Sequence, residues 1–240
     1  MLLSELAEAS GVSIASIKYY RREGLLPAGE RLTATRQDYG RAHLERLALI
    51  QVLREVAEAP IARIAQLTAI LDDPRQPFLR ALGAAQLIAL GLPAEEPATE
   101  DPDRPEHPSI APLLSHLGWP DVETAPRRAL DELLHGFESW GMPAGPETLR
   151  RYAAPVAQIA QADVASIREL PGEPDGAGLS PDVQVMRAVA GAIAFDRLIQ
   201  LLRALGHSSY SILQARGAGE AGEAGEAGEA RENGETTGEL

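Results

Sequence analysis

Two short helical stretches joined by one turn constrain the fold of this chain more than any other feature of its sequence. Residues 2–9 form the first stretch, with Ser4 as its candidate N-cap, and Gly11 ends it. Ser13 can cap the second stretch, which ends at Gly24. The apolar positions of both stretches recur at helical spacing and are Leu3, Leu6, Ala7, Ile14, Ile17 and Tyr20. Two short helices around a glycine-containing turn predict a helix-turn-helix.

Composition favours helix for the rest of the chain as well. Apolar residues make up 45% of the 240 residues and aromatic residues only 4%, while alanine and leucine dominate. Residues 28–39 are polar and contain Gly29, which is typical of a loop or a small β-wing. We therefore expect a mainly all-α protein with a winged helix-turn-helix at its N-terminus.

Proline and charge patterns divide the chain into segments. Helical periodicity returns after residue 41, again from Pro60 to residue 71, and over residues 77–92. Further helices are predicted over 126–140, over 146–170 with a distortion at Pro155, and over 181–205. The expected domains are a winged helix-turn-helix unit (1–73), a connecting and possible dimerisation helix (74–92), a Pro-rich acidic linker or loop (93–112), a helical domain (113–215) and a tail (216–240).

The tail repeats glycine at every third position but contains no proline, which argues against a collagen-like helix. Its low hydrophobicity and its glutamates predict disorder. The tail also contributes to the formal net charge of −13. Residues 1–54, in contrast, hold eight basic and six acidic side chains, a net charge of +2. The N-terminal unit is therefore suited to phosphate contacts even though the whole chain is acidic.

The N-terminal segment resembles a known family. The stretch LSELAEASGVSIASIKYYRREGLLP, followed by a wing and then by HLERLALIQVLREV and IARIAQLTAIL, is similar to the DNA-binding domain of the MerR family of transcription regulators. The resemblance spans residues 2–71. It implies a dimer that binds double-stranded promoter DNA and distorts it, so that RNA polymerase can engage the promoter.

The recognition helix supplies most of the candidate DNA contacts. Its N-terminal part places five side chains toward base edges or flanking phosphates, namely Ser13, Ile14, Ala15, Ser16 and Lys18. The side chains near its C-terminal end would reach the DNA backbone and are Tyr20, Arg21 and Arg22. The resemblance implies DNA contacts at Lys18, which replaces the usual arginine, and at Tyr20.

The wing adds three further candidate contacts, Arg31, Arg36 and Tyr39. A common wing pattern in the family is Gly-Tyr-Arg-x-Tyr, whereas this chain has Thr-Arg-Gln-Asp-Tyr over residues 35–39, so only the final tyrosine is retained. Other roles stay open for several side chains. Ser13 could act as a cap, Tyr19 could pack in the core, and Arg41 and Arg46 could pair with Glu45 or Asp38.

The family's long coiled coil does not follow the N-terminal unit here, because Pro74 and Pro77 interrupt it. We expect a homodimer that uses either the connecting helix or the C-terminal unit. The C-terminal unit is predicted to regulate the protein by binding a small-molecule or protein effector. Its candidate ligand-binding residues are aromatic side chains that could equally form a core: Trp119, Phe137, Trp140 and Tyr152.

Several functions lack any sequence signal. The chain has no cysteine and its five histidines are scattered, so no metal site is expected. No phosphate-binding loop, nucleophile elbow or zinc-hydrolase helix is present, so we expect neither an enzyme nor a bound cofactor. A signal peptide and a membrane span are also lacking, which predicts a cytoplasmic location. The predicted function is sequence-specific promoter binding, and the alternative is a helix-turn-helix-derived protein-interaction module that does not read DNA.

Overall fold

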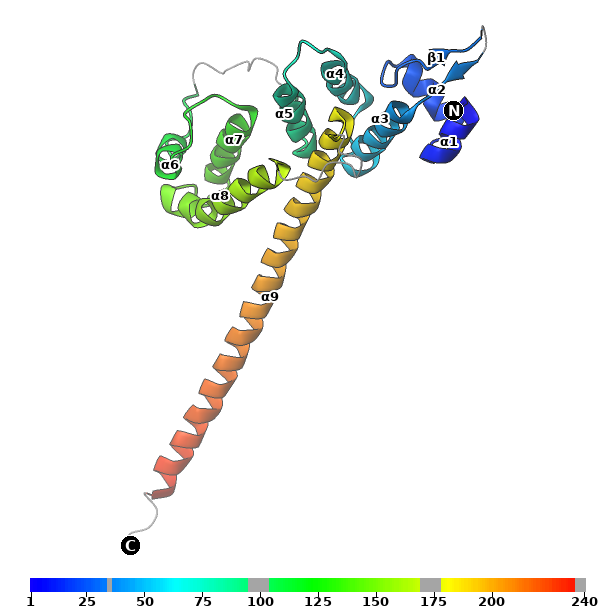
Figure 1. Cartoon of the computed structure of the whole chain (residues 1–240). Helices are drawn as coiled ribbons and strands as arrows, with labels where there is room; N and C mark the ends of the chain where they lie inside the picture. The colour runs from blue at the N-terminus through cyan, green and yellow to red at the C-terminus, as the bar shows by residue number, and fades with distance from the viewer. Residues whose placement is uncertain (34–35, 95–103, 169–177, 236–240) are drawn as a thin grey trace. The chain divides into compact units, whose positions relative to one another are not determined.

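A computed structural model describes residues 1–33, 36–94, 104–168 and 178–235, and only the backbone of 166–168 and 217–235. These residues are mainly helical, as predicted, and Figure 1 shows the order of the elements. The chain falls into two compact units, residues 1–193 and 194–240.

The predicted helix-turn-helix is confirmed. Helix α1 spans Leu3–Ser10 and α2 spans Ile14–Arg22. Gly11 ends α1 in the left-handed region at φ 70°, where glycine carries no steric penalty. Helix α1 begins after Leu2 and not after Ser4, because the carboxylate of Glu5 accepts a 2.7 Å hydrogen bond from the Leu2 amide.

The wing is small but ordered as a hairpin. Strands β1 (Glu30–Arg31) and β2 (Gln37–Asp38) pair antiparallel, with Glu30 opposite Asp38. Gly29 precedes β1 at a point where a Cβ atom would lie only 2.5 Å from the Asp38 carbonyl oxygen. Only glycine lets the two wing segments approach this closely.

Four helical segments follow the wing. They are α3 (Arg41–Gln51), a π-helical stretch η1 (Val52–Val56), α4 (Ile61–Asp72) and α5 (Phe78–Ala89). Pro60 precedes α4, as the sequence predicted. In the segment after residue 41, where helical periodicity was predicted, Leu47, Ile50 and Leu53 are inaccessible to solvent.

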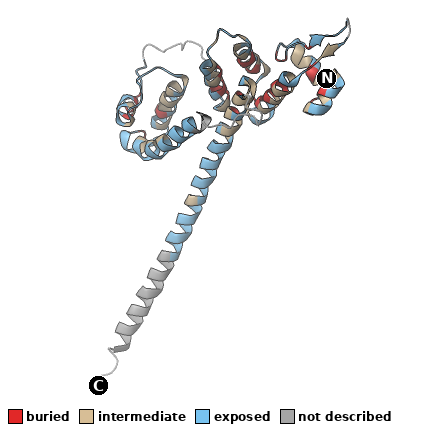
Figure 2. Cartoon of the chain, viewed as in Figure 1, coloured by how far each residue is buried: buried red, intermediate tan, exposed pale blue. Residues whose placement is uncertain are grey.

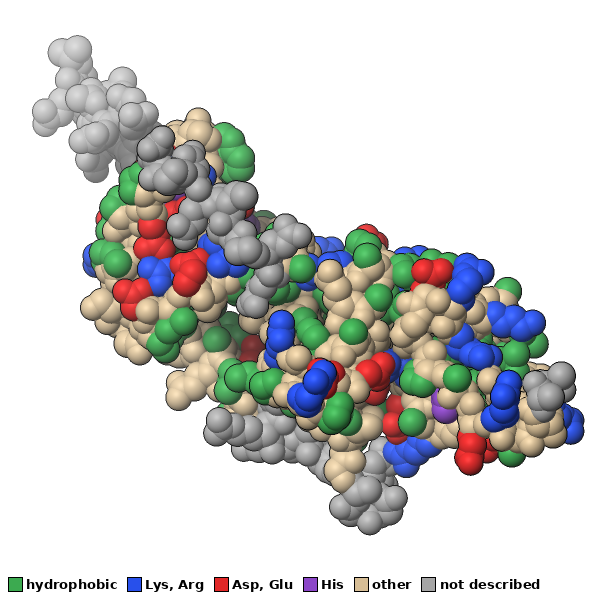
Figure 3. Space-filling model, turned by 90° about the horizontal axis from the view of Figure 1, so that it is seen from above, with side chains coloured by type: hydrophobic (Ala, Val, Ile, Leu, Met, Phe, Trp, Pro, Cys, Tyr) green, Lys and Arg blue, Asp and Glu red, His purple; other side chains and the backbone are tan. Residues whose placement is uncertain are grey.

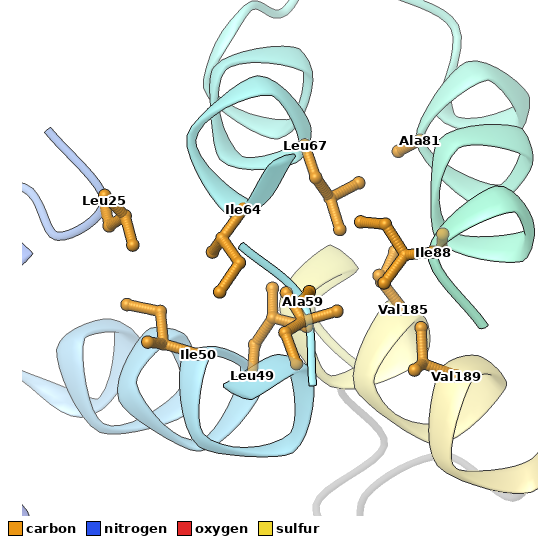
Figure 4. Packing of buried hydrophobic residues seen from close by; sticks show 12 residues of the cluster. Leu25, Leu49, Ile50, Ala59, Ile64, Leu67, Ala81, Ile88, Val185 and Val189 are labelled. Atoms are coloured by element: carbon orange, nitrogen blue, oxygen red, sulfur yellow. The ribbon is translucent and has the colours of Figure 1, made fainter. Parts of the chain in front are cut away.

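Two apolar clusters hold these elements together. The N-terminal core joins α1, α2, the wing and α3, and contains Leu6, Val12, Ile17, Leu26, Tyr39 and Leu47. The central core joins the end of α2 to α3, η1, α4 and α5 (Figure 4), and contains Leu25, Leu49, Ile50, Leu53, Ala59, Ile64, Leu67, Ala81, Ala85, Ile88, Val185 and Val189. Leu25 and its neighbour Leu26 thus enter different clusters, so the exit of the recognition helix lies where the two cores meet.

The last two members of the central core come from the start of α9 (Pro181–Glu235). The sequence grouped residues 181–205 with the second helical domain, 113–215, but the buried side chains of Val185 and Val189 pack with α4 and α5 residues. They lie four residues apart and so face the same side of the helix. The N-terminal domain is therefore completed by a segment from the far end of the chain.

A separate cluster forms among α6 (Ile110–Leu117), α7 (Ala125–Ser139) and α8 (Pro146–Arg168). Its buried residues are Ile110, Leu134 and Ala144. The sequence assigned residues 93–112 to a linker, whereas His107, Ser109 and Ile110 are buried and α6 begins within that range. Pro112 misled the prediction, because proline is tolerated in the first turn of a helix.

Helix α9 is buried at its start and exposed afterwards (Figure 2). From residue 194 to 216, every residue except Gly206 is exposed. The helix continues to Glu235, where the sequence predicted a disordered tail from residue 216, and residues 236–240 lie outside the described residues.

Candidate nucleic-acid interface

The recognition helix α2 begins with a side-chain cap. The Ser13 hydroxyl oxygen accepts a 3.0 Å hydrogen bond from the Ser16 amide, and the two hydroxyl groups lie 2.8 Å apart. This geometry satisfies an amide at the helix N-terminus, so Ser13 caps the helix. Ile14, Ala15 and Lys18 are exposed beyond it, and Ser16 is partly exposed. The N-terminal face of α2 is thus open to a ligand.

Cationic side chains surround this face. Lys18, Arg31 and Arg36 are exposed, and their side chains make no hydrogen bond or ion pair with any other described residue. Figure 3 shows Lys and Arg side chains gathered over the N-terminal elements, at the right of the view. Surface cations without a carboxylate partner are suited to phosphate groups, because no competing carboxylate has to be displaced.

Arg21 is held by the wing. Its Nη1 donates a 2.8 Å hydrogen bond to the Tyr39 hydroxyl, which in turn donates to Gln37 Oε1 at 3.0 Å. The guanidinium also lies 5.9 Å from the centre of the Tyr39 ring. Tyr39 itself is only 2% exposed. The sequence predicted Tyr39 as a DNA contact; in the structure its side chain is buried and its hydroxyl accepts a hydrogen bond from Arg21.

Arg22 is more exposed and interacts more loosely. Its guanidinium carbon lies 5.2 Å from the centre of the Tyr19 ring, and Nε lies 3.4 Å from Glu23 Oε1. Tyr19 and Tyr20 are half-buried with ring centres 5.9 Å apart. Tyr20 also packs against both cores, so the two tyrosines form the base from which the arginines extend.

An open hollow of about 460 Å³ adjoins the recognition helix. Helix α2 lines it with Ala15, Ser16, Tyr19 and Tyr20, and the other wall holds Arg54 and Ile61. Arg54 was counted as a basic residue of the sequence but not as a candidate contact. It lies on the π-helical stretch η1, where the usual period of 3.6 residues does not apply, so helical spacing could not place it.

The buried basic residue Arg46 behaves differently from its neighbours. Arg41 Nε forms the expected pair with Glu45 Oε1 at 2.6 Å. Arg46 pairs with neither Glu45 nor Asp38; it contacts the carboxylates of Asp72 and Asp182 instead. Both partners are distant in sequence, which is why local spacing did not reveal them.

The four aromatic residues predicted to bind a ligand differ in their surroundings. Phe137 packs against the core of α6–α8, and its ring lies 6.3 Å from that of the exposed Trp140. Trp119 and Tyr152 are also exposed. A hollow of about 350 Å³ does lie between α6 and α8, lined by Ser109, Pro112, Leu113, Ser115, His116, Pro146, Leu149 and Arg150, and none of the four aromatic residues lines it.

Two kinds of feature are absent from the described residues. No three His, Asp or Glu side chains gather there in a way that could hold a metal ion. Within the same ranges, no helix combines the length and the apolarity that crossing a membrane would require.

The comparisons with known proteins agree with this geometry. The family model described as MerR HTH family regulatory protein matches residues 1–69, which are α1, α2, the wing, α3, η1 and most of α4. Residues 1–69 are a MerR-family helix-turn-helix domain. The chain is accordingly similar to DNA-binding transcription regulators, and none of the relatives described below is designated an enzyme.

Two relatives from Haemophilus influenzae illustrate the extent of this MerR-type similarity. One, designated a probable heavy metal-dependent transcriptional regulator, is 36% identical over 76 residues, which are 32% of this chain and 59% of that protein. A ZntR homologue, designated an HTH-type transcriptional regulator, is 36% identical over 50 residues, 21% of this chain and 37% of its own length. The chain thus spans less than two thirds of either relative.

A solved structure extends the similarity beyond the MerR-type domain. SCO5550 from Streptomyces coelicolor A3(2), designated a transcriptional regulator, matches with a TM-score of 0.58 and 28% identity. The match covers 88% of this chain and 96% of SCO5550.

Proposed function

We propose that this protein is a transcription regulator that binds promoter DNA as a homodimer and distorts it. The observation that carries the proposal is the open face of α2, where Lys18 is unpaired among the described residues and Arg21 is fixed by Tyr39. The recognition helix would enter the major groove, while Arg22, Arg31 and Arg36 contact phosphates on either side. Such a protein acts where promoters are, in the bacterial cytoplasm, and needs neither a cofactor nor a catalytic site.

The exposed part of α9 supports a dimer. Nine large apolar side chains in it are 37–70% exposed: Phe195, Leu198, Ile199, Leu201, Leu202, Leu205, Tyr210, Ile212 and Leu213. Phe195, Leu198, Leu202 and Leu205 follow one another at spacings of three and four residues, the pattern of a coiled-coil seam. A single helix buries no such row by itself and is only marginally stable in water.

A second copy of the chain is the partner that fits this row best. A seam of this kind matches itself when two helices associate about a two-fold axis. The same axis would place two recognition helices on the two halves of a pseudo-palindromic site. Binding energy gained at both halves can then be used to bend or untwist the DNA between them, and RNA polymerase would engage the distorted promoter.

The helical unit α6–α8 is the proposed regulatory module. Its 350 Å³ hollow is lined by the apolar side chains of Leu113 and Leu149 and by the exposed polar side chains of His116 and Arg150. These features are suited to a small effector. The exposed Trp140 and Tyr152 lie outside the hollow and would suit a protein effector instead.

Selection of genomic fragments by the full chain, followed by footprinting, tests the proposed function. We expect a selected sequence in a promoter, protected on both halves, with an affinity that falls steeply as salt rises. A Lys18→Ala/Arg22→Ala variant should bind that sequence at least about tenfold more weakly, because two phosphate-directed cations are lost. An Arg80→Ala variant, which removes an exposed arginine from α5, is the matched control and should bind normally.

Absence of a selected sequence at moderate salt would contradict the proposal, and so would unchanged binding of the double variant. Either result would favour the alternative that the helix-turn-helix serves as a protein-interaction module.

A further inference from the structure

The guanidinium of Arg46 joins three distant parts of the first compact unit. Arg46 lies on α3 and its side chain is 6% exposed. It bonds Asp72 at the C-terminal end of α4, Asp182 in the first turn of α9, and the carbonyl oxygen of Leu25 directly after the recognition helix. No other described ion pair links α9 to the residues that surround the recognition helix.

All five N–H groups of Arg46 are used in this arrangement. Nη2 donates to Asp72 Oδ1 at 2.6 Å and to Asp182 Oδ2 at 3.4 Å. Nη1 donates to Asp72 Oδ2 and to the Leu25 carbonyl oxygen, both at 3.2 Å, and Nε donates to Asp182 Oδ1. Each carboxylate is therefore held in a two-pronged geometry, which fixes orientation as well as distance.

The electrostatics favour a permanently charged link. Burial by itself would lower the pKa of Arg46, but the hydrogen bonds and charges of Asp72 and Asp182 outweigh burial and raise it. The guanidinium carries one positive charge and faces two carboxylates, so the loss of one carboxylate still leaves Arg46 with a partner. Substituting one carboxylate at a time therefore reveals the separate contributions of Asp72 and Asp182.

The beginning of α9 is fixed around Asp182. The Val183 amide donates to the Ser180 hydroxyl at 3.3 Å, and the Gln184 side chain donates to the Leu179 carbonyl oxygen at 2.7 Å. Val185 and Val189 then enter the central core, of which Leu25 is also a member. The ion pair and the apolar contacts thus act on the same turns of α9.

We infer that Asp182 is a positioning residue which, through Arg46, fixes α9 relative to the exit of the recognition helix and thereby sets the half-site spacing that the protein accepts. This inference rests on the proposed function, because in a dimer held by α9 the separation of the two recognition helices depends on how each domain is attached to its own α9. Arg46 and Asp182 need not touch DNA for this role.

Half-site spacing provides the decisive measurement. The full chain is tested on its selected site and on versions with one or two base pairs inserted or deleted between the halves. The wild-type protein should prefer the original spacing by at least about tenfold, and Asp182→Asn should reduce that preference about tenfold, the effect of losing one charge-assisted bond. Its affinity for the original site should change less, because the base contacts are intact.

Three matched variants separate positioning from general stability. Asp72→Asn removes the other carboxylate of Arg46 but leaves α9 attached, so it should lower the melting temperature and keep the spacing preference. Glu45→Gln breaks an exposed pair on the same helix and should change neither quantity. Asp182→Glu retains the charge and should restore most of the preference.

The inference is overturned if Asp182→Asn keeps the wild-type spacing preference, or if Asp72→Asn loses it to the same extent. If the wild-type protein selects no DNA, the proposed function fails. Hydrogen exchange then tests whether Asp182 holds the start of α9 in place. The amides of Val185 and Val189 should then exchange about tenfold faster in Asp182→Asn than in Glu45→Gln. Equal exchange rates would overturn the link independently of DNA binding.

Discussion

Tyr39 contacts Arg21 and Gln37 in a way that its position in the sequence did not reveal. Its hydroxyl lies between Arg21 Nη1 and Gln37 Oε1, while its ring is buried in the N-terminal core. A tyrosine in this place can orient Arg21, a proposed phosphate contact, without reaching DNA itself. The wing therefore contributes to the recognition helix even though most of the family's wing pattern is missing.

A Tyr39→Phe variant tests this role. The ring stays buried while the two hydrogen bonds are lost, so the free energy of unfolding should fall by only about 1 kcal/mol. The affinity for DNA should fall several-fold, because Arg21 is no longer held in one orientation. Fluorescence anisotropy with labelled operator DNA and urea unfolding would measure the two effects.

Tyr152→Phe is the control for that substitution, since Tyr152 is exposed on α8, outside both the helix-turn-helix and the apolar row of α9. It should leave both the affinity for DNA and the stability unchanged. Wild-type affinity in Tyr39→Phe would show that Arg21 needs no support from the wing.

Among the secondary-structure elements, the recognition helix α2 ends where Gly24 determines. The φ of this glycine, +76°, lies in the left-handed region, and a Cβ atom there would meet no other atom within 4 Å. A Gly24→Ala change should therefore destabilise the protein through backbone strain alone, by about 1–2 kcal/mol. Urea unfolding would measure this loss.

Gly83→Ala is the control, and its expected effect on stability has the opposite sign. Gly83 lies within α5 and is exposed, and a methyl group at this position would likewise meet no other atom within 4 Å. Gly83→Ala should stabilise the protein by about 0.5–1 kcal/mol, because alanine loses less backbone entropy in a helix. If both substitutions had the same sign, the φ of Gly24 would not be the determining factor.

The apolar row of α9 leads to a prediction about the oligomeric state. Leu202→Asp places a charge within the seam and should convert the dimer to a monomer at micromolar concentration. DNA affinity should fall with it, because the two half-sites are then bound independently. Sedimentation equilibrium and anisotropy would follow the two changes.

Ala204→Asp adds the same charge on the opposite side of the same helix, roughly 160° from Leu202 at the period of 3.6 residues per turn. It should remain dimeric. A dimeric Leu202→Asp protein would exclude this seam as the interface.

Across the whole molecule, the features that the sequence predicted correctly are those that depend on residues adjacent in the chain. Glycine turns, the Ser13 cap and the apolar period gave α1, α2, α3 and α4 to within a few residues. These features are local, so one sequence is sufficient to reveal them. The open basic face of α2 was predicted for the same reason.

Long-range partners were not predictable in this way. Nothing near Arg46 in the sequence points to Asp182, and nothing near Val185 points to the central core. The burial of Tyr39 and the location of Arg54 likewise depend on elements that meet only after folding. Helix α6 was missed because three prolines between residues 105 and 112 resembled the linker that precedes it.

Completion of the central core by Val185 and Val189 has a consequence for how the protein is made. While the ribosome is still adding residues 93–180, the nascent N-terminal domain has an apolar surface on α4 and α5 that its own neighbours cannot cover. Closing such a long loop costs little more than closing a loop of half its length, about 0.6 kcal/mol, but it cannot begin until the late segment has been synthesised. The N-terminal domain can therefore complete its core only after most of the polypeptide has been translated.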